Sequence, residues 1–96
     1  MAVRLAKRLL SESVLDSIIL SDEIEISEIM VPDKMSGQSF IGIDIRKKRG
    51  LNIIAIVHHG KTITEIEPDY KFDKGDIVVV IGHRTNVAKF EEYLLI

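Results

Sequence analysis

Two short apolar runs constrain the fold of this chain most. They are "IIAIV" at residues 53–57 and "IVVVI" at residues 77–81, each five residues long and rich in β-branched side chains. Five residues suit a strand buried on both faces and fall far below the roughly 20 residues of a membrane-spanning helix. We therefore predict a strand covered on both faces over residues 51–58 and another buried strand over residues 77–81, in a soluble, intracellular protein.

Length and composition narrow the class further. Ninety-six residues correspond to one domain, and a hydrophobic content of 46% is enough to form a core. The formal net charge of −2 gives no overall field that would attract nucleic acid, so an anion site would have to be local. The absence of cysteine excludes disulfides, thiolate zinc sites and cysteine nucleophiles.

The N-terminal part predicts a helix followed by a strand. In residues 2–20, apolar side chains recur at four-residue spacing, which predicts a helix with a wide apolar surface, typical of a connector from a longer protein. "EIEIS", starting at Glu23, alternates and predicts a strand. The alternation slips between Ile26 and Ile29, which predicts a bulge before Pro32 stops the strand.

Residues 39–50, "SFIGIDIRKKRG", have two interpretations. Ile41, Ile43 and Ile45 alternate as in a strand, and periodicity alone favours this reading. Ile41 and Ile45 would also share one face of a helix, which Ser39 could cap and Gly50 could end.

The C-terminal half predicts a hairpin, a strand and a helix. "HHGK" turns the chain into a second strand at residues 61–67, and a loop containing Gly75 leads to the strand at 77–81. Thr85 can cap a last helix whose inward side chains are Val87, Phe90 and Leu94. The order of elements predicts an α+β sandwich.

No pattern of catalytic or metal-binding residues stands out. His58 and His59 are adjacent and would point to opposite faces of a strand, so we expect turn residues and no metal site. Asp69, Asp73 and Asp76 lie in a turn-rich loop without the spacing of a calcium loop. Because no nucleophile or phosphate-loop motif is present either, we expect a protein that is not an enzyme.

The basic run at residues 46–49 lies directly before the apolar run. It suits an exposed helix end, where cations interact favourably with the helix dipole. It also suits an anion site, because Arg46 and Asn52 are, respectively, a charged and a neutral donor for phosphate oxygens. Spacing alone leaves both readings open.

Two stretches resemble a known family. "IRKKRGLNIIAIVHHGKTITEIEPDYKFDKGDIVVVIG" resembles the C-terminal RCK domain, also called TrkA-C, and "LAKRLLSESVLDSIILSDEIEISEI" is similar to the connector helix and first strand of KtrA-type gating subunits of Ktr/Trk potassium-uptake systems. The resemblance implies a β-α-β-β-β-α sandwich in a two-fold dimer. It also makes residues 39–48 a helix with Ile41 and Ile45 on one face. Residues 1–22 would be a connector helix from a missing N-terminal RCK domain, and residues 23–96 the regulatory domain.

The resemblance also implies a function and partners. Cyclic di-AMP would bind between two subunits and inhibit potassium uptake, whereas ATP or ADP would bind the missing N-terminal domain, leaving this domain without a cofactor. The full-length protein would form an octameric ring beneath a membrane channel subunit of KtrB/TrkH type. It would be cytoplasmic and peripheral to the inner face of the membrane, with no direct membrane insertion and no nucleic-acid partner. A ligand-free dimerisation module of a related cation transporter or antiporter regulator is the alternative.

Site residues follow from the same resemblance. Arg46 and Asn52 match positions that face the ligand phosphates, and Asp44 matches a polar contact to base or ribose. Four residues match the apolar walls around each adenine: Ile41, Ile45, Ile53 and Pro68. Phe40 departs from the aliphatic residue of the family pattern and would stack on adenine or narrow the pocket.

Overall fold

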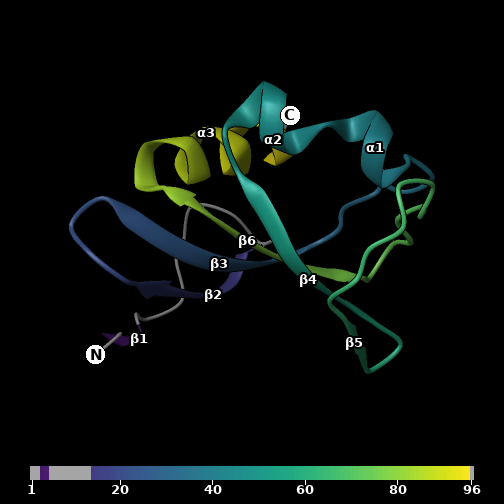
Figure 1. Ribbon diagram of the computed structural model, residues 1–96, viewed down its shortest axis with the longest axis horizontal. Helices are drawn as coiled ribbons and strands as arrows, with labels where there is room; N and C mark the ends of the chain where they lie inside the picture. Colours follow the sequence, from purple (N-terminus) through teal and green to yellow (C-terminus); the bar gives the residue numbers. More distant parts are fainter. Residues whose placement is uncertain (1–2, 5–13, 96) are drawn as a thin grey trace.

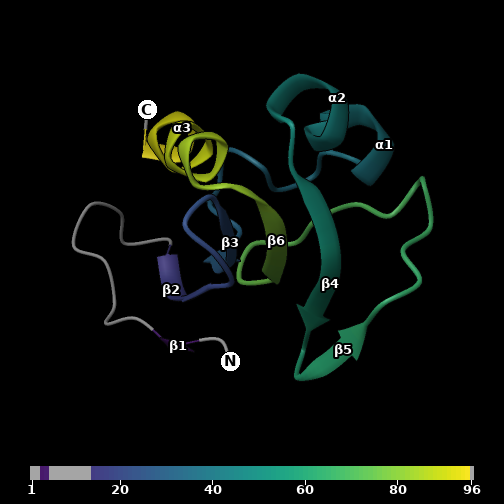
Figure 2. The same ribbon diagram turned by 60° about the vertical axis from the view of Figure 1, so that its left-hand side comes forward.

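The computed structural model describes residues 3–4 and 14–95, which form one antiparallel sheet with its helices on one side (Figures 1 and 2). The strand order is β1-β2-β3-β6-β4-β5. The elements are β1 (Val3–Arg4), β2 (Val14–Ile19), β3 (Ile24–Met30), α1 (Phe40–Ile43), α2 (Ile45–Arg49), β4 (Asn52–His58), β5 (Lys61–Ile63), β6 (Ile77–His83) and α3 (Arg84–Leu95). The predicted α+β class is confirmed. No helix in the described ranges is long and apolar enough to cross a membrane.

The helix predicted over residues 2–20 is wrong where the chain can be described. Val3–Arg4 and Val14–Ile19 are strands, and β2 pairs antiparallel with β3. Residues 1–2 and 5–13, the rest of the predicted connector helix, lie outside the described residues. The physical reason is that "VLDSII" is rich in β-branched residues and lies beside the edge of β3 that β6 does not use. Hydrogen bonds to β3 therefore stabilise a strand here, against the four-residue periodicity.

The strand predicted after Glu23 is confirmed as β3, but the bulge within it is wrong. β3 pairs regularly with β6, from Ile24 opposite His83 to Met30 opposite Ile77. Glu25, Ser27 and Ile29 face the core, so the isoleucines change face without any slip of the backbone. The register irregularities lie in β2, which pairs with β3, and in β4, which pairs with β6.

Residues 40–49 are helical, as the resemblance implied and against the periodicity. Ser39 caps α1 by accepting a hydrogen bond from the Gly42 amide at 2.9 Å. Gly50 ends α2 with a φ of 69°, in the left-handed region that glycine adopts without strain. Both signals were readable in the sequence. The segment is nevertheless two short helices rather than one.

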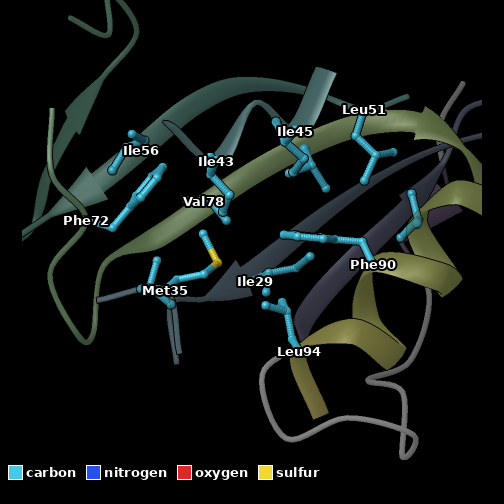
Figure 3. Packing of buried hydrophobic residues seen from close by; sticks show 13 residues of the cluster. Ile29, Met35, Ile43, Ile45, Leu51, Ile56, Phe72, Val78, Phe90 and Leu94 are labelled. Carbon is cyan, nitrogen blue, oxygen red and sulfur yellow. The ribbon is translucent and has the colours of Figure 1, made fainter. Parts of the chain in front are cut away.

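The core lies between the sheet and the helices (Figure 3). The predicted inward residues of the last helix, Val87, Phe90 and Leu94, are buried. The helix begins at Arg84, one residue before the predicted cap Thr85, and the Arg84 amide donates to the Glu23 carbonyl at 2.8 Å. Among the residues whose burial the structure describes, the buried apolar ones are Ile29, Val31, Met35, Ile43, Ile45, Leu51, Ile56, Phe72, Val78, Val80, Val87, Phe90 and Leu94.

The hairpin formed by β4 and β5 differs from expectation in two respects. β4 was expected to be covered on both faces, but Ile54 is 42% exposed, so one face of the strand is open in a single chain. β5 ends at Ile63, short of the expected Glu67. The connecting turn has positive φ at His59 (49°) and Gly60 (78°), the conformation of a two-residue hairpin turn.

Candidate functional site

α1 and α2 meet the start of β4 at the upper right of Figure 2. A hollow of about 280 Å³ opens between these elements. Its lining residues are Phe40, Ile41, Asp44, Ile45, Arg46, Asn52 and Ile53. All seven belong to the predicted ligand-binding set. The eighth, Pro68, is not part of the lining, but its carbonyl accepts a hydrogen bond from the Ile41 amide at 2.9 Å.

Asp44 gives the hollow its shape. It has φ 45° and ψ 49°, a left-handed conformation that ends α1 and starts α2. The break turns successive side chains apart: Ile45 is 3% exposed and belongs to the core, whereas Ile41 is 66% exposed. The expectation that these two share one helix face is therefore wrong, because a continuous helix would be needed. They instead line the hollow from its inner and outer sides.

Arg46 is the cation best placed to act in the hollow. It is exposed and lines the hollow, and within the described part of the chain no carboxylate pairs with it. The other basic residues of α2 differ. Arg49 lies over the Tyr93 ring, 4.1 Å from its centroid, and Lys48 lines a separate hollow beside Phe90 and Tyr93. Arg46 therefore lines the hollow at the start of β4, whereas Lys48 and Arg49 lie beside Tyr93.

The main chain of a distant loop holds the outer wall of the hollow. The Phe40 amide donates to the Tyr70 carbonyl at 2.7 Å, and the Phe72 amide donates to the Gln38 carbonyl at 3.0 Å. With the Ile41 to Pro68 bond, these fix the first turn of α1 against residues 68–72. The wall depends on backbone bonds, which do not require particular side chains in the loop.

A second polar cluster lies at the other end of β4. Asp76 is buried and receives hydrogen bonds from the Tyr70 hydroxyl at 2.6 Å, from the Asp73 amide at 3.1 Å and from His58 Nδ1 at 2.7 Å. Burial would raise the pKa of Asp76, but these hydrogen bonds outweigh it and hold the pKa below its ordinary value. The pKa of Tyr70 is raised, chiefly because its hydroxyl is buried and secondly because the hydroxyl bonds to Asp76.

Sequence reasoning missed this cluster. It placed His58 and His59 on opposite faces, but their rings stack with centroids 4.0 Å apart. The reason is that His59 is in the turn with positive φ, so strand alternation does not apply to it. The expectation that "HHGK" turns the chain is confirmed, but the stacking of the two rings that this turn produces was not predicted.

The chain is similar to a known domain family and to a potassium-uptake protein. The TrkA-C domain matches residues 24–95, three quarters of the chain. Ktr system potassium uptake protein A of Bacillus subtilis is 36% identical over 91 residues, covering 95% of this chain and 41% of that protein. The chain thus spans less than half the length of this relative.

Two solved structures share the fold. The RCK C domain of the potassium transport protein KtrA, solved in complex with cyclic diadenosine monophosphate, has a TM-score of 0.71 and 40% identity, covering 77% of this chain and 87% of that one. The RCK_C domain dimer of Streptococcus agalactiae BusR, in complex with the same dinucleotide, has a TM-score of 0.62 and 26% identity, covering 70% and 91%. The matched residues span the hollow, β4 and the loop that holds α1, and this chain belongs to the TrkA-C domain family.

Proposed function

We propose that this chain is the regulatory ligand-binding domain of a gating subunit for potassium uptake, and that it binds cyclic di-AMP between two copies to inhibit transport. One observation carries the proposal: seven residues expected to contact the ligand line a single hollow. Their chemistry suits half of the ligand. Apolar side chains form a slot for adenine, and Arg46 with Asn52 supply donors for a phosphate.

The shape of the hollow supports a site shared by two chains. At about 280 Å³ it lies just below the range of roughly 300–1,000 Å³ that encloses a drug-sized ligand. Ile41, on its outer rim, is 66% exposed, so the rim offers apolar surface to a second chain. A two-fold dimer presents every patch twice, as does a ligand made of two equal halves.

The rest of the proposal concerns the longer protein. Because the chain spans 41% of its Bacillus relative, we propose that residues 23–96 form the regulatory domain and that a preceding RCK domain binds ATP or ADP. The whole subunit would form an octameric ring in the cytoplasm, beneath a membrane channel subunit of KtrB/TrkH type. In this proposal the domain has no enzymatic activity, and cyclic di-AMP is a regulatory ligand rather than a cofactor.

A thermal-shift screen with cyclic di-AMP, cyclic di-GMP, ATP and AMP tests the proposal. A ligand that binds only the folded state raises the melting temperature, and the stabilisation grows with the logarithm of its concentration divided by its dissociation constant. We expect cyclic di-AMP to give the largest shift, with one ligand bound per two chains by calorimetry. Sedimentation at micromolar concentration should give about twice the chain mass of 10.8 kDa.

The screen also separates the alternative function. A dimerisation module of a related cation transporter or antiporter regulator would sediment as a dimer, since exposed Ile41 and Ile54 still need cover. It would show no shift with any of the four nucleotides. A clean monomer at micromolar concentration that also ignores cyclic di-AMP would exclude both functions.

A further inference from the structure

The turn between β4 and β5 brings three potential metal ligands together. One nitrogen each of His58 and His59 and one carboxylate oxygen of Asp73 lie within 4.8 Å of one another. We propose that these three residues bind one Zn²⁺ ion per chain. The site is independent of the proposed function: β4 is seven residues long and separates the cluster from Asn52 in the hollow by about 20 Å at the rise of a strand.

The backbone turn places the two histidines side by side. His59 has a φ of 49° and Gly60 a φ of 78°, so the chain reverses directly after His58. This reversal places the imidazole rings side by side, with centroids 4.0 Å apart and planes inclined by 14°. Both imidazoles therefore lie at the same turn before any ion binds, and an ion that bonds to both must tilt the rings out of this stack.

Asp76 orients the first of these rings. His58 Nδ1 lies 2.7 Å from Asp76 Oδ1, and Asp76 is only 2% exposed. The Tyr70 hydroxyl holds the other oxygen of Asp76 at 2.6 Å. A histidine that ligates zinc commonly donates its second ring N–H to a carboxylate, which fixes the tautomer. Asp76 provides this partner, and Nε2 of His58 keeps the lone pair for the ion.

Asp73 supplies the third donor from a fixed backbone and a free side chain. Its amide donates to Asp76 at 3.1 Å, whereas its carboxylate is 61% exposed and lies 3.7 Å from His58 Nδ1. The carboxylate lies on the Nδ1 side in the structure, so the proposed site requires this exposed side chain to rotate toward Nε2. A tetrahedral ion would then have two imidazoles, one carboxylate and a fourth position for water. Imidazole donors favour Zn²⁺ over Mg²⁺ and Ca²⁺, which prefer oxygen ligands.

Calorimetry and Co²⁺ absorption test the site on the chain and three variants. His59→Asn removes one ligand, and asparagine tolerates the positive φ of this turn. Asp73→Asn removes the carboxylate and keeps the side-chain size. His83→Ala is the matched control, because it removes an exposed histidine at the end of β6, outside the cluster. We expect one Zn²⁺ per chain, and Co²⁺ should give the visible absorption bands of a tetrahedral site.

The three variants give distinct results. His59→Asn and Asp73→Asn should each weaken Zn²⁺ binding at least tenfold and remove the Co²⁺ bands, and His83→Ala should leave both unchanged. Circular dichroism identifies any variant that fails to fold. A fourth variant, Asp76→Asn, replaces the orienting carboxylate with an amide and should cost about 10–100-fold in affinity. Binding that is equal in the chain and both ligand variants, or no saturable binding at one equivalent of Zn²⁺, would overturn the proposal.

Discussion

Replacement of Arg46 by alanine tests the candidate site most directly. Arg46 lines the hollow, is exposed and has no carboxylate partner in the described part of the chain, so its truncation should leave the free protein intact. We expect the free energy of unfolding in urea to change by less than about 0.5 kcal/mol, as for most surface substitutions.

The loss of ligand affinity should be much larger. A charge-assisted hydrogen bond to a phosphate contributes about 1.5–3 kcal/mol. We take the lower figure because Arg46 is exposed in the single chain. In a two-fold complex the substitution removes this bond at both phosphates, which gives about 3 kcal/mol, or roughly a hundredfold in dissociation constant.

Lys48→Ala is the matched control, measured by titration calorimetry with cyclic di-AMP. Lys48 lies on the same helix and carries the same charge, but it lines the separate hollow beside Tyr93. Its removal therefore reports the general effect of one positive charge, which is small at physiological salt. If the two variants bind cyclic di-AMP equally well, Arg46 does not hold a phosphate, and the basic run is only an exposed helix end.

Three further predictions follow from other parts of the structure. Cyclic di-GMP should bind at least tenfold more weakly than cyclic di-AMP by calorimetry, because apolar walls leave the extra polar edges of guanine unpaired, at about 1–3 kcal/mol for each such group; equal binding would mean that the adenine slot is wrongly assigned. Asp44→Gly should stabilise the chain by about 0.5–1 kcal/mol in urea unfolding, because glycine adopts the left-handed conformation of Asp44 without steric cost; a loss of stability would show that the Asp44 side chain makes an important contact. Gly82→Ala should destabilise the chain by about 1–3 kcal/mol, because a Cβ at this position would lie 2.5 Å from Leu51 Cδ2 in the core; an unchanged unfolding midpoint would mean that Leu51 has room to move.

Local signals predicted the C-terminal half of the fold well. The strand at 77–81 and the inward residues of the last helix came from apolar periodicity, which works where one face of an element is buried and the other is not. Ser39 and Gly50 marked the helical segment correctly, although alternation of its isoleucines favoured a strand. A helix cap depends only on a few neighbouring residues, so it indicates a helix even where the apolar periodicity fits both a helix and a strand.

Periodicity failed where tertiary pairing decides the structure. The spacing in residues 14–19 fits a helix face, but an available neighbour in β3 made the segment a strand. No local pattern states which edge of a sheet is free. The left-handed break at Asp44 was not predicted either, because aspartate adopts this conformation more readily than most residues but at few positions, and no local pattern marks them.

The candidate site was predicted by resemblance and not by residue chemistry alone. Spacing could not show that Arg46 and Asn52 converge, because α2 and β4 are joined through Gly50, whose positive φ sets their relative direction. Pro68 does not line the hollow of the single chain, and its carbonyl accepts a hydrogen bond from the Ile41 amide, so its place in the site stays a prediction. The turn at "HHGK" was predicted correctly, but the histidine cluster was missed because the two rings were expected on opposite faces, as on a strand.

The backbone clasp between α1 and residues 68–72 has a consequence for how this protein can change over evolution. The hydrogen bonds of Phe40 and Ile41 reach carbonyl groups, and every residue type carries a carbonyl. Exposed side chains such as those of Pro68, Asp69 and Lys71 are therefore free to drift without moving the wall they support. A lineage could alter the rim of the hollow residue by residue while its position stays constant, and ligand preference could diverge on an unchanged scaffold.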